Sequence, residues 1–418
     1  MEEWKIYRLG DLVDFQNGYA FKSSKFLYDG KYKIIRIKEL KNGLVKFFED
    51  TVSISDEPNE ILSKILVNKG DVIFALTGDP VSKQNANSWV GRVSLYTHDI
   101  PAYLNQRTCK IIQCNNVVPQ YVYYYFRQYE NLYSLASKAT GSASQANIST
   151  KILEDTEILL PSLSVQKKMV AILASLDNKI ALNRRINDNL EQQAQALFKS
   201  WFVDFEPFKD GKFVESEMGM IPEGWKVVQL GEIIEISKRF INPQKNPDKI
   251  FYHYSLPACD NGLIPEIQSG KDIMSNKIIL QNNTILFSKL NPRIKRIWFA
   301  CDVLNDSICS TEFIPYRAKN ERESVYIYSI INSDSFYASV LGCVNGATGS
   351  HQRFHAEDTL GLLFPYKKDI VDKYIDLVKP VLTEIHKLRI ENKTLALTRD
   401  SLLPRLMSGE LKINDLNC

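Results

Sequence analysis

The chain has 418 residues, of which 44% are hydrophobic and 24% are charged, and its formal net charge is +3. No run approaches the roughly 18 apolar residues that a membrane span needs, the first residues lack the order of a signal peptide, and the seven cysteines form no Cys-x-x-Cys pair. These features argue against a membrane protein, a secreted disulfide scaffold and a clustered zinc site, and they predict a cytoplasmic protein large enough for two packed cores.

The chain contains a tandem duplication. Trp4-Lys5 followed by Leu9-Gly10-Asp11 returns as Trp225-Lys226 followed by Leu230-Gly231-Glu232, 221 residues later (225 − 4). Thr140-Gly141-Ser142 returns as Thr348-Gly349-Ser350, 208 residues later (348 − 140), and Gln145 and Gln352 follow the two copies. Such a period is too long for a solenoid repeat, so we expect two similar globular units with two similar ligand sites.

The first globular unit is predicted to be a small α+β domain. Runs rich in β-branched and aromatic residues at 33–37, 71–75 and 110–112 predict strands. Residues 119–129 predict a helix, and we interpret its aromatic face as core rather than as a surface that stacks on bases.

Two polar loops of this unit are candidates for contacts with DNA. One follows the strand at 71–75, and the other follows the Thr-Gly-Ser segment. Asparagine and glutamine can pair with the adenine edge, whereas lysine and arginine can neutralise phosphate or pair with guanine. The candidate DNA-binding residues are Thr77, Lys83, Asn85, Asn87, Arg92, Ser142, Ser144, Gln145 and Asn147.

Residues 165–202 predict one long helix with a coiled-coil seam. Apolar and amide residues recur at alternating steps of four and three, and no proline or glycine interrupts them. The seam residues are Leu176, Ile180, Asn183, Asn187, Leu190, Ala194, Leu197 and Trp201. A buried amide destabilises a protein unless it finds a partner, so we expect the seam asparagines to set the register through partner amides.

The second globular unit repeats the first but carries different polar loops. Residues 284–287 predict a strand, and the following segment 289–296 holds four cations. This segment is typical of a phosphate and guanine site, although a solvated loop would look similar. The candidate DNA-binding residues are Lys289, Asn291, Arg293, Lys295, Arg296, Ser350, His351, Gln352 and Arg353.

A second long helix is predicted over residues 370–407. Pro380 should bend it or delay its start, and Pro404 with Gly409 should end it. Its seam residues are Tyr374, Val378, Val381, Ile385, Leu388, Asn392, Leu395, Arg399 and Leu402. Two narrow seams in one chain most simply pack on each other, and the alternative is that each helix covers only its own unit. The predicted fold class is therefore α+β, with two similar globular domains separated by two long helices packed as an antiparallel coiled coil.

The sequence lacks recognisable catalytic machinery. It has no Gly-x-x-x-x-Gly-Lys-Ser/Thr phosphate loop and no Asn-Pro-Pro-aromatic segment of an adenine methyltransferase. Glu39 and Lys41, with Asp29 upstream, form a tripeptide seen in nucleases that is common by chance. Among the histidines only His351 and His355 have a metal-ligand spacing, and without a third ligand they more simply face DNA or water. We expect no catalytic residues, no cofactor and no metal site.

Three segments resemble the specificity subunit of type I restriction-modification enzymes. They are Ala-Leu-Phe-Lys-Ser-Trp-Phe-Val-Asp-Phe at 196–205, Met-Ile-Pro-Glu-Gly-Trp at 220–225 and Leu-Leu-Pro-Arg-Leu-Met-Ser-Gly-Glu-Leu at 402–411. The resemblance implies two target recognition domains, at 1–162 and 225–366, which each read one half of a bipartite DNA site. It also implies that the helical regions 163–206 and 367–418, with a linker at 207–224, fix the spacing of the half-sites and dock partners.

The resemblance further implies the partners of the chain. They are double-stranded DNA, two methyltransferase (modification) subunits that methylate adenine with S-adenosylmethionine, and restriction/translocase subunits, while the chain itself is a non-catalytic recognition subunit. Val165-Gln166 departs from the family's usual Glu-Gln, which affects only the start of the first long helix. The alternatives are a coiled-coil scaffold that joins proteins without DNA, and a metal-dependent nuclease that uses Glu39 and Lys41.

Overall fold

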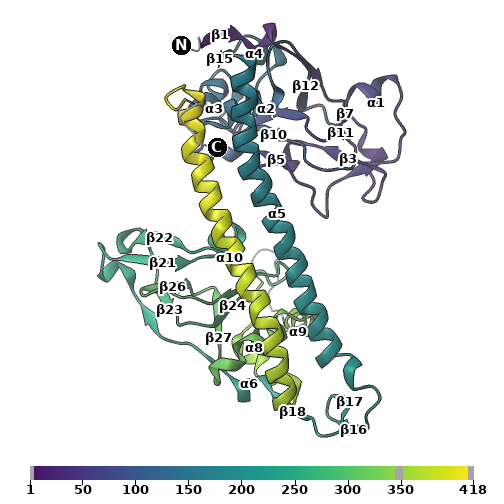
Figure 1. The fold of residues 1–418 in the computed structure, drawn as a ribbon, viewed down its shortest axis with the longest axis vertical. Coiled ribbons are helices and arrows are strands. Elements are labelled where there is room, and N and C mark those ends of the chain that lie inside the picture. The colour runs from purple at the N-terminus through teal and green to yellow at the C-terminus, as the bar shows by residue number, and fades with distance from the viewer. Residues whose placement is uncertain (1–3, 344–351, 413–418) are drawn as a thin grey trace. The chain divides into compact units, whose positions relative to one another are not determined.

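The computed structural model describes residues 4–343 and 352–412, and the chain divides into two compact units (Figure 1). The first unit contains Met1–Asn178 and Leu395–Cys418, and the second unit contains Lys179–Thr394. Two helices of 40 residues each, α5 (Leu163–Phe202) and α10 (Lys368–Met407), contribute to both units. Among the described residues no helix is long and apolar enough to cross a membrane.

The first unit is built on sheets and short helices, of which α2 is largely buried. Its sheets have the strand orders β2-β12-β8-β10-β5-β4, β6-β3-β11-β7, β13-β14-β9 and β1-β15. Its strands are β1 (Lys5–Arg8), β2 (Val13–Asn17), β3 (Tyr32–Ile35), β4 (Leu40–Lys41), β5 (Leu44–Val45), β6 (Ser53–Ile54), β7 (Leu66–Val67), β8 (Val72–Ala75), β9 (Thr77–Gly78), β10 (Val93–Leu95), β11 (Ala102–Leu104), β12 (Thr108–Cys114), β13 (Thr140–Ser142), β14 (Gln145–Asn147) and β15 (Glu157–Leu160). Its remaining α-helices are α1 (Glu60–Lys64), α2 (Pro119–Arg127), α3 (Tyr129–Ala136) and α4 (Thr150–Glu154).

The second unit has the corresponding sheets. Their strand orders are β19-β27-β24-β25, β20-β23-β26-β21-β22, β18-β28 and β16-β17. The strands are β16 (Phe213–Ser216), β17 (Gly219–Pro222), β18 (Lys226–Gln229), β19 (Ile234–Ile236), β20 (Phe240–Ile241), β21 (Ile250–Tyr254), β22 (Glu266–Ser269), β23 (Lys277–Ile279), β24 (Thr284–Ser288), β25 (Ile297–Ala300), β26 (Ser307–Ser310), β27 (Phe313–Ala318) and β28 (Leu363–Tyr366). The remaining α-helices are α6 (Leu230–Ile233), α7 (Leu256–Asp260), α8 (Ser324–Asn332) and α9 (Asp334–Gly342).

The two units repeat one topology, as the sequence repeats predict. The order β2-β12-β8-β10 matches β19-β27-β24-β25, and the parallel pair β3/β11 matches β21/β26. The last strand of each unit pairs antiparallel with an early strand, β15 with β1 and β28 with β18. Tyr121 of α2 donates a hydrogen bond to the carbonyl of Leu159 in β15, and Tyr326 of α8 does the same to Pro365 in β28. The duplication therefore extends to single side chains.

The aromatic face of α2 lies in the core, as predicted. Of the predicted face, Tyr121, Val122 and Phe126 are buried and Tyr125 is half-buried, and the Phe126 ring packs on Phe74 of β8 at a centroid distance of 5.5 Å. Burying a large apolar side chain stabilises a fold by about 1.5–3 kcal/mol. These rings therefore hold α2 on the sheet and are not available to stack on bases.

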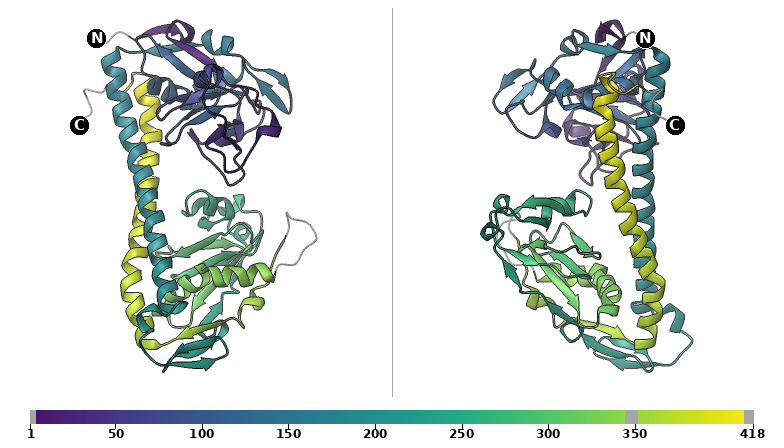
Figure 2. Two further views of the ribbon diagram at one scale, coloured as in Figure 1. Left: turned by 90° about the vertical axis from the view of Figure 1, so that its right-hand side faces the viewer. Right: turned by 60° about the vertical axis from the view of Figure 1, so that its left-hand side comes forward.

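Helices α5 and α10 pack antiparallel within each unit and run side by side in both views of Figure 2. In the first unit Val165 and Met169 near the start of α5 share a core with Leu406 near the end of α10. In the second unit Phe198 near the end of α5 packs on Tyr374 near the start of α10, with ring centroids 6.0 Å apart. The predicted seam residues of both helices are buried or half-buried, so the predicted coiled coil is confirmed.

Two details of the helix pair differ from the prediction. Asn183 is fully buried, but its amide nitrogen donates to the carboxylate of Glu391 at 2.8 Å and not to a partner amide. Pro380 does not delay the second helix, because α10 already begins at Lys368. A charged acceptor strengthens the hydrogen bond that Asn183 donates in this poorly solvated seam, but the side-chain oxygen of Asn183 has no hydrogen-bond partner in the described part of the chain.

In each unit a carboxylate of α5 connects a shorter helix, α2 or α8, to the pair of long helices α5 and α10. In the first unit Asp177 accepts hydrogen bonds from Tyr124 of α2 at 2.8 Å and from Arg399 of α10 at 2.6 Å. In the second unit Glu191 accepts one from Tyr328 of α8 at 2.8 Å and lies 3.7 Å from the guanidinium of Arg389. Each carboxylate therefore joins three helices at one point.

Asp177→Ala should lower the free energy of unfolding of the first unit by about 2 kcal/mol, because it leaves the buried Tyr124 hydroxyl without its charged acceptor and leaves Arg399 with Asp400 as its remaining carboxylate partner. Urea-induced unfolding of the full chain measures this loss. Asp188→Ala is the control, since Asp188 is an exposed acid on the same helix with no side-chain partner in the described part of the chain. Equal stability of the two variants would contradict the proposed role of Asp177.

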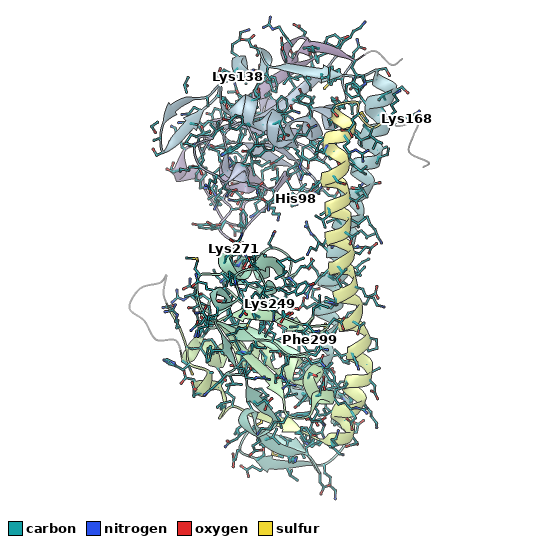
Figure 3. The ribbon with its side chains drawn as sticks, turned by 90° about the vertical axis from the view of Figure 1, so that its left-hand side faces the viewer. His98, Lys138, Lys168, Lys249, Lys271 and Phe299 are labelled. Carbon is teal, nitrogen blue, oxygen red and sulfur yellow. The ribbon has the colours of Figure 1, made fainter. Side chains whose placement is uncertain are left out.

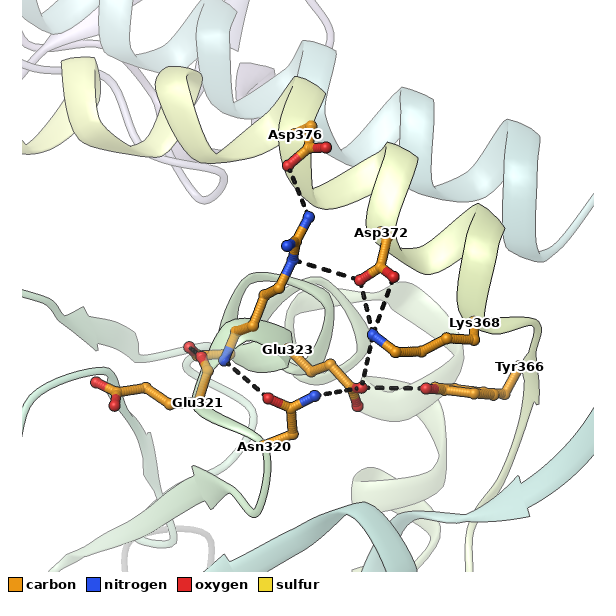
Figure 4. A network of polar contacts seen from close by, with 9 residues as sticks. Asn320, Glu321, Glu323, Tyr366, Lys368, Asp372 and Asp376 are labelled. Carbon is orange, nitrogen blue, oxygen red and sulfur yellow. Dashed lines mark hydrogen bonds and ion pairs between the residues drawn. The ribbon is translucent and has the colours of Figure 1, made fainter.

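The starts of α5 and α10 are held by different chemistry. Buried Gln166 of α5 accepts from the amide of Val118, at the start of α2, and donates to the carbonyl of Pro161. At the start of α10, Glu323 accepts from Tyr366 at 3.1 Å and pairs with Lys368 at 3.7 Å (Figure 4). The network in Figure 4 extends from Lys368 through Asp372 and Arg322 to Asp376. The Val165-Gln166 dipeptide, where the sequence departs from the family's usual Glu-Gln, thus lies where α5 begins beside α2. Gln166 connects these elements through hydrogen bonds and without an ion pair.

Candidate nucleic-acid interface

In the first unit the structure brings the two predicted polar loops together. Strand β9, at the start of one loop, pairs with β14, which pairs with β13 of the Thr-Gly-Ser segment. The Thr77 hydroxyl donates to the side-chain oxygen of Asn147 at 2.7 Å. Gly141 has a φ of +141°, and a Cβ there would lie 2.3 Å from the carbonyl oxygen of Gln145, so this tight hairpin needs glycine.

The loop after β9 is ordered by an aromatic anchor. Trp89 is buried, packs on Tyr129 and Tyr133 of α3, and donates its indole N–H to the carbonyl of Lys83 at 2.6 Å. The Lys83 ammonium contacts Asp79 at 2.8 Å. Six candidate residues keep exposed side chains, namely Lys83, Asn85, Asn87, Ser142, Ser144 and Gln145. The first unit therefore presents a fixed loop pair with amide and hydroxyl groups toward solvent.

Arg92 is not part of this exposed set, and its candidate role is corrected. Its side chain is buried and donates to the carbonyl oxygens of Ile37 at 2.8 Å, Ser88 at 3.0 Å and Trp89 at 3.0 Å. A guanidinium whose donors are satisfied by the fold has none left for a base. Arg92 instead joins the loop to the neighbouring sheet.

The second unit brings the equivalent loops together. Leu290 forms an antiparallel bridge with Arg353, and the amide of Asn291 donates to the carbonyl of Gln352 at 2.9 Å. Thr77 and Gly78 make the same pairings with Asn147 and Ala146 in the first unit. By this register Gln352 corresponds to Ala146. The sequence repeat had instead suggested that Gln352 corresponds to Gln145. The candidates Ser350 and His351 lie outside the described residues.

Several candidate cations of the second unit are engaged within the protein. Arg296 makes two hydrogen bonds to Asp260, at 2.6 and 2.9 Å, and this pairing raises the pKa of its guanidinium. The Lys295 ammonium donates to the carbonyl of Asn332 at 2.6 Å, and desolvation there lowers its pKa. Arg353 makes two hydrogen bonds to Glu312, at 3.2 and 3.0 Å.

Arg293 and Lys289 remain as the cations without an ion pair or a side-chain hydrogen bond in the part of this loop that the structure describes, and Arg293 is exposed. Two further cations, Lys249 and Lys271, lie near the start of β21 (Figure 3). Lys249 pairs with Asp306 at 2.6 Å. Arg293 is therefore the strongest candidate for contact with DNA in the second unit.

The second unit also contains a polar cavity that no sequence motif indicates. It has a volume of about 350 Å³ and is lined by His253, Gln268, Lys277 and Ser310 among others. The His253 ring is buried, which lowers its pKa, and its Nδ1 contacts the Gln268 side-chain oxygen at 2.7 Å. The Ser310 hydroxyl accepts from the amide of Glu312, the partner of Arg353. The residues come from separate strands, so no local motif announces them.

The structure does not support the alternative that the chain is a nuclease using Glu39 and Lys41. Glu39 is fully buried and accepts hydrogen bonds from Arg36 and Thr51, each at 3.2 Å. A carboxylate enclosed in this way cannot reach a scissile phosphate. Glu39 therefore has a structural role, at the end of the turn that leads into β4.

Comparison with known proteins gives consistent matches. The sequence profile described as "Type I restriction modification DNA specificity domain" matches residues 1–192. The MjaIX type I restriction enzyme specificity subunit of Methanocaldococcus jannaschii is 26% identical over 99% of this chain and 95% of the relative. The HindI specificity subunit of Haemophilus influenzae is 29% identical over 98% of this chain and 100% of the relative.

The fold also has a solved counterpart. The crystal structure of a type I restriction-modification system S subunit from M. genitalium has a TM-score of 0.57 at 17% identity, covering 97% of this chain and 96% of that chain. At this identity the likeness concerns the fold. Neither a protein-interaction scaffold nor a nuclease gains support from these matches.

Proposed function

Because the chain belongs to the family of type I restriction-modification specificity subunits, we propose that its two units each read one half of a bipartite DNA site. The proposed recognition domains are residues 1–162 and 225–366. The helical regions 163–206 and 367–418, with the linker 207–224, set the spacing of the half-sites. The chain carries no catalysis of its own in this proposal, and it acts on double-stranded DNA in the cytoplasm.

The observation that supports this proposal is one hydrogen-bonded frame with two different sets of side chains. In both units the loop after the central strand pairs with the segment before the last strand. The first frame exposes lysine, asparagine, serine and glutamine, whereas the second exposes the cations Arg293, Lys295 and Arg353, of which the last two are hydrogen-bonded within the protein. Such side chains can distinguish adenine from guanine in the major groove. Two readers of unlike half-sites need this combination of a shared frame and unlike contacts.

Two methyltransferase subunits and the restriction/translocase subunits are the proposed protein partners. Co-expression of the chain with its methyltransferase subunit, followed by genome-wide mapping of methylated adenine, tests the proposal. We expect a single bipartite motif that disappears when the chain is omitted. A continuous motif, or methylation that does not depend on the chain, would overturn the assignment.

Arg293→Ala should weaken DNA binding through the second half-site only. A bidentate arginine–guanine pair contributes about 1–3 kcal/mol, and a phosphate contact would instead reduce the salt dependence of binding by about one unit of slope. Fluorescence anisotropy of the complex with the methyltransferase, at several salt concentrations, measures both quantities. Lys295 is not part of this variant, because its ammonium group donates a hydrogen bond to the carbonyl of Asn332.

Lys212→Ala is the control for this experiment, because Lys212 is an exposed cation of the same unit outside the recognition loops. DNA duplexes altered in one half-site at a time show where the contact is lost. Loss of discrimination at both half-sites in the Arg293 variant would count against two separate readers.

A further inference from the structure

Three potential metal ligands from distant parts of the sequence meet in the second unit. Cys301 and Asp302 follow β25, and His386 lies on α10. The cysteine sulfur, a carboxylate oxygen of Asp302 and a ring nitrogen of His386 all lie within 4.8 Å of one another. The histidine stands 84 positions after the aspartate (386 − 302), so no ligand-spacing motif connects them.

The distance between two of these groups is typical of ligands to a common metal ion. The Nε2 atom of His386 lies 3.5 Å from Oδ2 of Asp302. A normal hydrogen bond between such atoms is shorter, at about 2.7–3.2 Å. Around a tetrahedral zinc ion with metal–ligand bonds of about 2.0–2.2 Å, nitrogen and oxygen ligands stand about 3.4 Å apart.

We propose that Cys301, Asp302 and His386 bind one Zn²⁺ ion, with the fourth coordination position open to water. Thiolate and imidazole together select zinc and other late transition metals, whereas Mg²⁺ and Ca²⁺ prefer oxygen ligands. Binding replaces the thiol proton of Cys301 with the metal, so a proton is released.

The fold presents the ligands to one point. Asp302 has a φ of +58°, a left-handed conformation that non-glycine residues seldom adopt and that turns the chain directly after Cys301. The amide of Val303 donates to the side-chain oxygen of Asn282 at 2.6 Å, which holds this turn. On α10 the neighbouring Ile385 is buried in the core, so the helix cannot rotate His386 away without exposing it.

The surrounding charges limit how tightly zinc is held. Arg389 stands one turn after His386 on α10, and its cation opposes a metal ion. Its guanidinium lies 3.7 Å from Glu191, which offsets part of that charge. The ligand set itself adds the negative charges of a thiolate and a carboxylate. We therefore expect a site weaker than structural zinc sites with four protein ligands.

Zinc at this point would join the connection between β25 and β26 to α10. Strand β25 pairs with β24, which leads into the recognition loop that carries Arg293. The metal would thus fix the sheet beneath this loop against α10, within one unit. This role does not depend on catalysis by the chain.

A zinc titration of the purified full chain tests the proposal. The chain is first stripped of metal with a chelator, and Zn²⁺ is then added in an isothermal titration calorimeter. We expect one Zn²⁺ per chain and a rise in unfolding temperature with added Zn²⁺. Titration with Co²⁺ should give the charge-transfer absorption of a cobalt–thiolate bond, which identifies a cysteine ligand in the wild-type protein.

Variants locate the site. Cys301→Ser and His386→Gln should each weaken Zn²⁺ binding by at least about tenfold, and Cys301→Ser should abolish the cobalt–thiolate band. Cys343→Ser is the matched control, since Cys343 is another partly buried free thiol of the second unit. The proposal is overturned if the wild-type chain binds no stoichiometric Zn²⁺, or if Cys301→Ser retains the band that Cys343→Ser loses. The wild-type titration decides the matter even if a variant fails to fold.

Discussion

Deleting residues 180–186 together with residues 390–396 should shorten the DNA spacer and leave both half-site sequences intact. Each deletion removes about 10 Å of helix, at about 1.5 Å per residue. Seven residues are one heptad, so the remaining seam residues keep facing the partner helix. Since duplex DNA rises about 3.4 Å per base pair, the spacer should lose up to about three base pairs.

The two deleted segments lie opposite each other. Asn183 of α5 contacts Glu391 of α10, so removing both segments keeps the antiparallel pair in step. Sequencing of methylated adenines in cells that express the variant with its methyltransferase reads the new spacer directly. Arg184→Ala with Arg185→Ala is the control, because these residues are exposed within the deleted heptad and their loss changes no length. An unchanged spacer in an active deletion variant would show that the helices do not set the distance.

The helix pair could be predicted because its signal is local and periodic. Ile180, Ala194 and Ile385 follow the heptad rhythm, and each is buried in the structure. The partner of Asn183 could not be predicted in the same way. The heptad pattern marks the seam position, but Glu391 lies beside the seam and its side chain reaches in from the flank.

The residues of the candidate DNA-binding site were harder to predict than the helices. Whether an arginine or lysine is free to contact DNA depends on partners that are distant in sequence. Arg92 and Arg296 occupy equivalent positions, since their carbonyls accept hydrogen bonds from Ala75 and Ser288, the last residues of β8 and β24. The sequence led us to predict that both side chains are free to contact DNA. One is buried against backbone carbonyls, and the other is bound to Asp260.

Separate strands also hide the cavity around His253. Its lining residues come from β21, β22, β23 and β26, from the start of α7 and from the segment 272–274, so they are spread over the sequence from 253 to 310. The repeats indicate that the two units carry equivalent loops, but neither the pairing of the loops nor its register could be read from them. The register is set by the bridge between Leu290 and Arg353, which the Thr-Gly-Ser match does not include.

Phe202→Ala should lower the free energy of unfolding of the second unit by about 3–5 kcal/mol, the usual cost of removing a large buried aromatic side chain. Phe202, near the end of the family-like segment 196–205, has only 2% of its surface exposed. Its ring contacts Tyr326 of α8, Tyr374 of α10 and Trp225, at centroid distances of 4.9, 5.2 and 5.7 Å. The side chain therefore joins α5 to α8, to α10 and to the segment just before β18.

This arrangement explains why Trp225 recurs as the counterpart of Trp4. Trp225 packs on Phe202 and Phe205 at the end of α5, and Trp4 lies against Gly409 just after the end of α10. In each unit the repeated tryptophan thus packs on the end of a long helix. Phe202, Phe205 and Trp225 are buried, so they belong to the core and not to a DNA-binding surface.

Chemical unfolding followed by tryptophan fluorescence should therefore show the Phe202→Ala transition at lower denaturant for the second unit, with the first unit unchanged. Val203→Ala is the matched control, because Val203 is the next residue and is 46% exposed, so its truncation should change stability by less than about 0.5 kcal/mol. In cells, the Phe202 variant should lose methylation that depends on the second half-site. If both units lose stability together, the two do not fold as separate bodies, and a lesion in one core would reach both half-sites through the shared helices.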